Sequence, residues 1–445
     1  MLERGVSDLR QQPLLFPCIA VDREFDENLE RHRFRMDEVD IGDITFLPGQ
    51  SESVHRWYRL TPSYSPGLVR FFIREFGIDN HSLVLDPFSG RGTTVIECQK
   101  NGIPAIGFEI NPLLQRVGSY SLTWHKHPDS LYQEFLTSTL RMISEHAKAS
   151  VHEVSESLGI PVPDIHDVFR WWKEDVMKDL IIAKACSRDA RFKPLESALW
   201  LALTETSLTC ANIHRNHPTI TFDDDHDRVI DVYSQLRRQV HEIAEDCRSL
   251  TAEQIALSGS CEVRLDDSCA PTSPLQAGSV SHVITSPPYP NRYSYVHQTR
   301  PQLHFMDVLR TRRCATDIDL KTVGGTWGAA TSILMKELLI PPKLLRPALS
   351  YWEALSQESV LMCNYATKYF LDLDRHLRSL RPMLAKGSRC AYVVGNSRLS
   401  GIEIYTETIL ARLFELAGFQ VERIILFRKR GGRKRLYETA VVATV

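Results

Sequence analysis

The sequence has no long hydrophobic run, no closely spaced cysteine pair and no excess of charge of one sign. No apolar stretch approaches the roughly 20 residues of a membrane-spanning helix, and the N-terminus, MLERGVSDLRQQ, lacks the basic-then-apolar layout of a secretory signal. The ten cysteines include no C-x-x-C pair, which argues against a zinc site, a redox dithiol or a disulfide scaffold. We therefore expect a cytoplasmic protein with no membrane segment and no metal.

The composition is that of an ordinary globular protein. Of the 445 residues, 43% are hydrophobic and 24% are charged, and there is no internal repeat or low-complexity tract. This length allows two or three domains, or one large domain with insertions. The net charge of −2 neither supports nor excludes nucleic acid as a partner, because binding depends on a local basic face.

Strand and helix patterns alternate after an N-terminal extension, residues 1–50, that shows little pattern. We expect a helix over residues 66–76, where Pro66 is followed by apolar residues at helical spacing. Two short buried strands are predicted at 83–86 and 105–110, each followed by a helix, at 93–101 and from 111. Strand, helix, strand and helix at this spacing predict a doubly wound, mostly parallel α/β sheet.

The alternation stops near Trp124, and residues 125–257 have helical patterns throughout, apart from a loop at 214–227. We interpret them as a helical insertion. Strand patterns return at 261–268 and 279–289, and an irregular stretch then extends to about Pro347, with an exposed loop at 324–332. The predicted elements that follow are a long helix over 351–384, a buried strand over 390–396, a helix over 406–419 that ends at Gly418, and an antiparallel hairpin over 421–445.

A glycine-rich turn follows the first predicted strand, in the sequence DPFSGRGTT from Asp86 to Thr94. Ligands of open parallel sheets bind outside the carboxyl ends of the strands, and Gly90 and Gly92 let the backbone approach a ligand closely. The next helix begins near Thr93, where free N–H groups favour a carboxylate. Glu109 ends the second strand about 20 residues later, where an acidic residue accepts hydrogen bonds from ribose hydroxyls.

A rigid corner ends a later strand at Ser286, Pro287, Pro288 and Tyr289. The two prolines fix φ and remove two backbone donors, so the corner presents carbonyl acceptors in a fixed arrangement. Tyr289 offers a flat face on which a base can stack.

The segments LVLDPFSGRGTT (83–94), GFEINP (107–112) and VITSPPYPNRYSY (283–295) together resemble the amino-methyltransferases of DNA. The resemblance covers 51–124 and 258–445 and implies a Rossmann-like methyltransferase domain, with 125–257 inserted in it. It implies S-adenosylmethionine as cofactor, double-stranded DNA as substrate and, by analogy alone, partner proteins of a restriction or phage-defence system. Many family members carry the two motifs in the reverse order, so the target-recognition region is hard to place; residues 125–257 are the first candidate and 291–350 the second, and a purely structural brace is the alternative for the insertion.

The resemblance also implies roles for individual residues at the cofactor. Asp86 would hold the amino group of the methionine part, Glu109 the ribose, and Asp267 the adenine amino group, with Asp266 as the alternative. The segment from Thr61 to Pro66 resembles the motif that closes over the methionine end, although its prolines also fit a simple helix start. The cofactor-binding residues predicted in this way are Thr61, Tyr64, Asp86, Pro87, Phe88, Gly90, Gly92, Thr93, Thr94, Glu109 and Asp267.

At the corner, an amino group of a base would donate hydrogen bonds to Ser286 and to the carbonyl of Pro287, which aims the nitrogen lone pair at the methyl carbon. In the resembled family, serine at the first position accompanies cytosine N4 and aspartate accompanies adenine N6, so we favour cytosine N4. Methylation at cytosine C5 uses a Pro-Cys pair, and the one such pair, Pro17 and Cys18, precedes the first strand; no covalent intermediate is implied. Adenine-N6 methylation, RNA methylation and a catalytically silent binding module are the alternatives.

Two further segments are candidates for contacts with the nucleic acid. Asn291, Tyr293 and Tyr295 follow the corner and are candidates for contacts near the base, or for ordinary packing. The predicted hairpin tip carries a basic run that would neutralise DNA phosphates, or would form a solvated turn. Its cations are Arg428, Lys429, Arg430, Arg433, Lys434 and Arg435.

Overall fold

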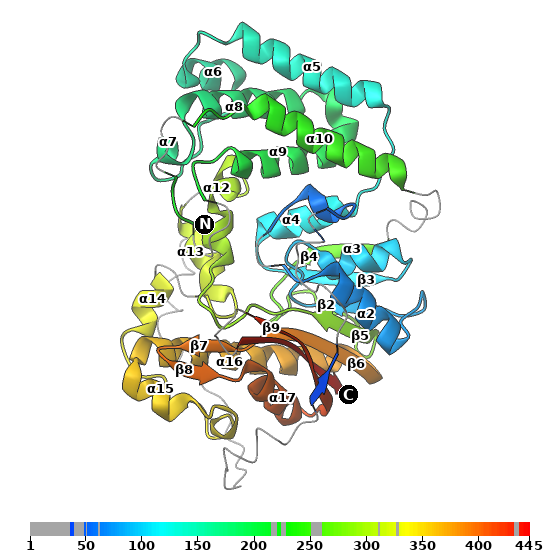
Figure 1. Cartoon of the computed structure of the whole chain (residues 1–445), viewed down its shortest axis with the longest axis vertical. Helices are drawn as coiled ribbons and strands as arrows, with labels where there is room; N and C mark the ends of the chain where they lie inside the picture. The colour runs from blue at the N-terminus through cyan, green and yellow to red at the C-terminus, as the bar shows by residue number, and fades with distance from the viewer. Residues whose placement is uncertain are drawn as a thin grey trace, which may run out of the picture.

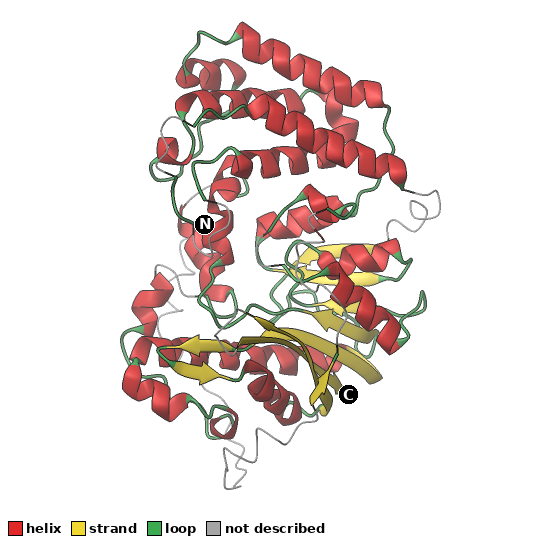
Figure 2. Ribbon diagram, viewed as in Figure 1, coloured by secondary structure: helices red, strands yellow, loops and turns green. Residues whose placement is uncertain are grey.

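The computed structural model describes residues 36–39, 49, 51–60, 63–214, 220–223, 228–250, 260–309, 312–325, 329–430 and 436–445. A central sheet has helices on both faces, and a separate group of helices lies beside one end of this assembly (Figures 1 and 2). Among the described helices, none is both long enough and apolar enough to cross a membrane.

The N-terminal half of the sheet forms as the sequence predicts. The order is α2 (Pro66–Phe76), β2 (Val84–Asp86), α3 (Thr93–Lys100), β3 (Ala105–Glu109) and α4 (Pro112–Ser121). The hydroxyl of Ser65 caps α2 by accepting a hydrogen bond from the N–H of Gly67, and Gly77 ends this helix in the left-handed conformation. Short apolar strands, together with side-chain caps on α2 and α4, are therefore the local basis of this half.

The eight-stranded sheet has the order β1-β9-β10-β6-β5-β2-β3-β4. The pairs are parallel except those of β10, which is antiparallel to both of its neighbours. This arrangement confirms the predicted doubly wound, mostly parallel fold with a C-terminal antiparallel hairpin. The remaining strands are β1 (Met36–Glu38), β4 (Cys261–Leu265), β5 (Val280–Thr285), β6 (Leu384–Gly395), β9 (Gln420–Arg430) and β10 (Leu436–Thr444).

Alternate residues of the central strands enter two separate hydrophobic cores. On β10, Ala440 and Val442 pack on the side of α2, α3 and α4, whereas Val441 and Ala443 pack on the side of α16 (Val360–Leu380) and α17 (Thr406–Leu416). Because both faces are covered, the middle of β10 is a continuous apolar run, Ala440 to Ala443. The carboxyl ends of the strands are therefore the part of the sheet that is open to a ligand.

The helical insertion is packed against the domain that it interrupts. Its elements are α5 (Asp129–Glu145), α6 (Val151–Leu158), α7 (Val168–Trp171), α8 (Glu174–Ser187), η4 (Ala190–Leu195), α9 (Glu196–Thr209) and α10 (Val232–Ser249). Figure 1 shows α9 nearest to α4. The carboxylate of Asp246 on α10 accepts hydrogen bonds from the backbone N–H of Val54 at 2.9 Å and the indole N–H of Trp57 at 2.7 Å.

The prediction of an irregular stretch up to about Pro347 is wrong. This part of the chain contains α12 (Tyr295–Phe305), α13 (Arg312–Lys321), α14 (Ala329–Leu334) and η5 (Arg346–Ala348). Pro301 lies inside α12 and weakens its helical signal, but tertiary contacts hold the helix: the side chain of Gln302 bonds Tyr58 and Thr204. Of the predicted loop at 324–332, residues 326–328 lie outside the described part, and α14 begins at Ala329.

The predicted single helix over 351–384 is also wrong, because the range divides into α15 (Trp352–Glu358), α16 and the short η6 (Arg381–Met383). α15 ends where Ser359 adopts an extended conformation, and the hydroxyl of Ser359 caps α16 by accepting from the N–H of Met362. A serine that caps one helix interrupts the preceding one. Three strands were not anticipated from the sequence, namely β1 at the sheet edge and the small pair β7 (Ser397–Leu399) and β8 (Ile402–Ile404).

Candidate active site

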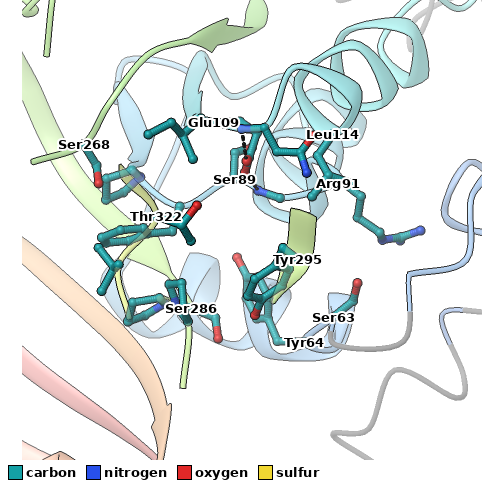
Figure 3. A pocket seen from close by; sticks show the side chains of 18 of the residues that line it. Ser63, Tyr64, Ser89, Arg91, Glu109, Leu114, Ser268, Ser286, Tyr295 and Thr322 are labelled. Carbon is teal, nitrogen blue, oxygen red and sulfur yellow. Dashed lines mark hydrogen bonds between the residues drawn. The ribbon is translucent and has the colours of Figure 1, made fainter. Parts of the chain in front are cut away.

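A cavity of about 330 Å³ opens at the carboxyl ends of β2, β3 and β5 and beside the loop after β4. Glu109 and Ser286 lie on opposite sides of it (Figure 3). The structure therefore brings the glycine turn and the corner together, although almost 200 residues separate them. The predicted site residues that line the cavity are Tyr64, Pro87, Phe88, Gly90, Thr93, Glu109, Asp267, Ser286, Pro287, Pro288, Tyr289 and Arg428.

Glu109 is fixed by the backbone of the turn that faces it. The N–H of Gly90 and the N–H of Asn111 each donate to one of its carboxylate oxygens at 2.7 Å (Figure 3). Gly90 has a φ of 55°, a conformation that glycine adopts at little cost. Burial raises the pKa of Glu109 to about 7, although these two donors oppose the rise.

We expect S-adenosylmethionine to bind about tenfold more weakly at pH 6 than at pH 8, because the role that the resemblance implies for Glu109, accepting hydrogen bonds from ribose hydroxyls, is that of the ionised carboxylate. Its raised pKa makes the neutral acid predominate at pH 6 and the carboxylate at pH 8. Titration calorimetry measures both dissociation constants. The Glu109→Gln variant is the control, since ionisation of the ligand itself affects both proteins; equal pH profiles for the two would contradict the prediction.

Asp86 lies wholly buried behind the cavity wall, at the end of β2. Its Oδ1 accepts hydrogen bonds from the hydroxyl of Thr285 at 2.6 Å and from the N–H of Phe88 at 3.1 Å. Its Oδ2 has no hydrogen-bond partner among the described residues. Burial raises the pKa of Asp86 to about 6. A buried carboxylate oxygen without a donor suits an ammonium group, so the residues present fit the methionine end of the cofactor.

The segment before α2 reaches the same place. Tyr64 and Thr94 are hydrogen-bonded through their hydroxyls, and Thr94 donates its own proton to the carbonyl of Ile284 at 3.1 Å. Tyr64 is therefore the donor in the first bond. Thr94 joins the lead-in segment to β5, and it is buried rather than exposed to the cavity. Thr61 lies outside the described residues.

Gly92 has a structural task at the start of α3. Its φ is 93°, and a Cβ at this position would lie 3.2 Å from the Cα of Gly118 on α4. It does not line the cavity, so the close approach that it permits is that of two helices. Thr93, the first residue of α3, does line the cavity, and the helix N-terminus therefore faces the ligand space.

The loop after β4 distinguishes the two aspartates that the sequence left open. The carboxylate of Asp266 already accepts four hydrogen bonds within its own loop. The donors are the N–H groups of Asp267, Thr272 and Ser273 and the hydroxyl of Thr272. Asp267 accepts one such bond, from the N–H of Cys269 at 2.8 Å. Asp267 is also the more exposed of the two. The remaining acceptor capacity favours Asp267 for an adenine amino group.

His376 on α16 supports this end of the cavity, and no sequence pattern indicated it. Its ring nitrogens lie 2.9 Å from the carbonyl of Ser268 and 2.6 Å from the hydroxyl of Tyr392, and the ring of Phe88 packs edge-on at 4.7 Å. Burial lowers the pKa of His376 to about 4, so the ring is neutral at physiological pH. It holds the loop of Asp267 and the ring of Phe88 in fixed positions.

The corner is held by two hydroxyl groups. Ser286 donates its proton to the carbonyl of Val393 on β6 at 3.1 Å, so its oxygen can only accept hydrogen bonds from a ligand. The hydroxyl of Tyr369 on α16 donates to the carbonyl of Pro288 at 2.7 Å. The arrangement offers acceptors to a ligand without any backbone donor from Pro287 or Pro288.

The cavity wall also includes candidates for contacts with the base and residues that were not predicted. Asn291, Tyr293 and Tyr295 line the cavity, as expected for candidates near a base. Lys321, Thr322 and Val323 at the end of α13 also line it, and they were missed because this helix was not expected. Arg428 donates from Nε to Glu438 at 2.7 Å. Arg433, Lys434 and Arg435 lie outside the described residues, as do the side chains of Lys429 and Arg430.

Within the described residues, one group of metal-binding side chain types converges, formed by Glu52, His55 and Glu97. Its polar atoms already have cationic partners. Glu97 accepts from Arg70 at 3.0 Å and from Lys100 at 3.1 Å, and the second ring nitrogen of His55 faces Arg91 at 2.7 Å. Three cations around the group disfavour a further one, so we interpret it as a buried ion-pair network beneath the turn.

Comparison with known proteins agrees with this geometry. Residues 45–117 match the sequence profile of the N6_N4_Mtase family, described as DNA methylase. The chain is 23% identical to the Type II methyltransferase M.AvaI of Nostoc sp. over 92% of this chain and 86% of that protein. It is 20% identical to M.BsoBI of Geobacillus stearothermophilus, over 87% and 83%, and 22% identical to M.MvaI of Kocuria varians, over 86% of each.

The sheet topology and the site together define a Rossmann-like methyltransferase. Within that class, the profile match and the similar Type II methyltransferases support the N4/N6 amino-methyltransferase family of DNA methylases. The matched profile contains the lead-in segment, the glycine turn and Glu109, and the relatives extend over the remaining elements, including the corner.

Proposed function

We propose that this protein transfers the methyl group of S-adenosylmethionine to the exocyclic N4 of cytosine in a specific double-stranded DNA sequence. The observation that carries the proposal is the corner: the proton of Ser286 is committed to Val393, so its oxygen faces the cavity as an acceptor. An amino group donates two hydrogen bonds, and the corner offers acceptors with no competing donor. The family assignment supports the amino group of a base as the target.

The chain contributes mainly position and electrostatics. S-adenosylmethionine supplies an electrophilic methyl group. Asp86, Glu109 and Asp267 would hold its amino group, its ribose and its adenine, respectively, each with the acceptor capacity described above. Ser286 and the carbonyl of Pro287 would accept from the target amino group and direct its lone pair toward the methyl carbon, so that in-line transfer follows from alignment.

The target base must leave the duplex to reach Ser286 in the cavity. Extruded bases are held by stacking on aromatic side chains and by hydrogen bonds to their polar edge. Tyr289, Tyr293 and Tyr295 supply aromatic surface in the wall of the cavity. The choice of cytosine over adenine rests on serine at the first position of the corner and on the resemblance to cytosine-N4 enzymes.

The insertion, residues 125–257, remains our first candidate for target recognition, and residues 291–350 remain the second. Asp246 and Gln239 bond residues 54–57, upstream of α2, and Thr204 bonds α12, which supports a bracing role for the inner side of the insertion. Recognition would then belong to its outward side. A restriction or defence setting is proposed because the relatives are named Type II methyltransferases.

Replacing Arg433, Lys434 and Arg435 by alanine is expected to reduce the salt dependence of DNA binding. Each phosphate contact adds about 0.9 to the slope of log K against log salt concentration, so the slope should decrease by up to about 3. Fluorescence anisotropy across a salt series measures it. A slope equal to that of the wild type would show that the hairpin tip does not contact the DNA backbone.

The proposed substrate is tested by transfer of a tritiated methyl group to unmodified DNA, with RNA as a competitor. Label in DNA that excess RNA does not reduce is the expected result. Label in RNA instead would contradict the proposal and favour RNA methylation. Cofactor binding without label in either polymer would favour a catalytically silent binding module.

A further inference from the structure

Glu438 on β10 joins the corner to the C-terminal hairpin. The hydroxyl of Tyr289 donates to its Oε1 at 3.3 Å, and Arg428 donates from Nε to its Oε2 at 2.7 Å. Glu438 is 5% exposed, yet it lines the cavity together with Tyr289 and Arg428. The buried carboxylate of Glu438 therefore links Tyr289 to Arg428, one through each oxygen. No motif in the sequence includes Glu438.

A β-bulge places this pair. In the pairing of β9 with β10, Glu438 is opposite Arg428 but Thr439 is opposite Leu426, so Phe427 has no partner residue. Bulges beside active sites redirect side chains. Phe427 is buried, and its ring packs edge-on against Phe71 and Phe72 of α2 at 5.7 and 6.1 Å. The core therefore fixes the bulge, which lets Arg428 and Glu438 face each other at the cavity.

We propose that Glu438 is a positioning residue that fixes the ring of Tyr289 for stacking on the extruded base, with Arg428 as the counter-ion that makes a buried carboxylate tolerable. The proposal rests on the proposed function, since it concerns a base held beside Ser286, but it does not depend on which base. A phenol ring bound only through its own side-chain torsions can rotate, whereas one whose hydroxyl is bound to a fixed carboxylate cannot. In this proposal the main role of the Arg428 side chain is to pair with Glu438 inside the protein, and its predicted contact with a DNA phosphate is secondary.

The competing explanation is an ion pair that merely joins two strands. The positioning role requires that Glu438 act through the hydroxyl of Tyr289, whereas the purely structural ion pair does not. The test is a double-mutant cycle on single-turnover methyl transfer, with Tyr289→Phe, Glu438→Ala and both together, at saturating cofactor and DNA. Tyr289→Phe removes the hydroxyl alone and leaves β10 unchanged, so it stays informative where Glu438→Ala destabilises the fold.

We expect each single variant to transfer the methyl group about tenfold more slowly, the loss for one hydrogen bond to a charged group, and the double variant to be slower than either by less than about twofold. Cofactor affinity should not change. Glu422→Ala is the matched control, because Glu422 forms a similar pair with Arg389 at 2.7 Å within the same sheet and does not line the cavity; it should keep the wild-type rate.

A wild-type rate in Tyr289→Phe, or losses that multiply in the double variant, would overturn the positioning role. Transfer by the wild-type protein to either base amino group leaves this test of Glu438 valid, because the cycle is measured on whichever product forms. No transfer to DNA by the wild type would instead overturn the proposed function, and this inference with it.

Discussion

Ser286→Ala is expected to lower the single-turnover rate of methyl transfer about 100-fold, a loss of the size seen when one preorganised hydrogen-bonding group is removed from an active site. The hydroxyl oxygen of Ser286 is the acceptor that would direct the lone pair of the target nitrogen, and alanine offers none. Because Ser286 lies across the cavity from Glu109, cofactor affinity should remain within about twofold of the wild type.

The matched control for this variant is Ser281→Ala. Ser281 lies at the start of β5, the strand that Ser286 directly follows, and its hydroxyl contacts the backbone of Leu83 and the ring of His282, away from the cavity. Each substitution removes one hydroxyl at an end of β5, so a common loss of rate would indicate strand distortion. Full activity of Ser286→Ala, with Ser281→Ala also active, would remove Ser286 from the mechanism.

Asp86→Asn is expected to weaken S-adenosylmethionine binding by about 100-fold or more without loss of fold stability. The substitution replaces one carboxylate oxygen by an amide N–H₂ and removes the negative charge that is proposed to receive an ammonium group. The substitution should stabilise the fold of the cofactor-free protein. Burial raises the pKa of Asp86 from its ordinary 3.8 to about 6, so the ionised group costs roughly 3 kcal/mol of folding stability above pH 6 in the wild type.

The sign of this cost follows from linkage. A carboxyl group whose pKa is raised on folding destabilises the native state whenever the pH is above the pKa that the group has in the unfolded chain. The full penalty applies once the pH exceeds the pKa of the folded state, about 6. The amide of asparagine has no such penalty, although its buried N–H₂ offsets part of the gain. The melting temperature at pH 8 should therefore equal or exceed that of the wild type.

Asp374→Asn is the comparison for this variant. Asp374 is also a buried aspartate with one oxygen lacking a partner among the described residues, but it is paired with Arg378 on α16 and does not lie at the carboxyl end of β2. Its substitution should leave cofactor affinity unchanged. An Asp86→Asn protein that binds the cofactor as tightly as the wild type would contradict the role given to Asp86.

The cofactor half was predictable because its signals are local. Each of its strands is a short apolar run, the helix that Pro66 opens covers the predicted residues 66–76, and the turn that follows Asp86 is contiguous in sequence. Glu109 could be predicted from its spacing alone, because the strand in which it lies is parallel to the first strand and adjacent to it. The structure adds the contact that explains the spacing, from Gly90 to Glu109.

The residues that support the corner and the loop of Asp267 could not be predicted, because their contacts join distant segments. Tyr369 reaches Pro288, His376 reaches Ser268, and Glu438 reaches Tyr289 across 81, 108 and 149 residues, respectively. Nothing in the local pattern of these helices and strands distinguishes such a side chain from ordinary packing. The same applies to α12, where the contacts of Gln302 outweigh the effect of Pro301.

Nucleoside mass spectrometry, with chromatographic standards, on DNA from cells that express the protein tests the central claim most directly. We predict N4-methylcytosine in the wild-type sample and its loss in cells that express the Ser286→Ala protein. N6-methyladenine would keep the amino-transfer mechanism and contradict the choice of base drawn from Ser286. DNA without either nucleoside would contradict the proposal that this protein methylates DNA.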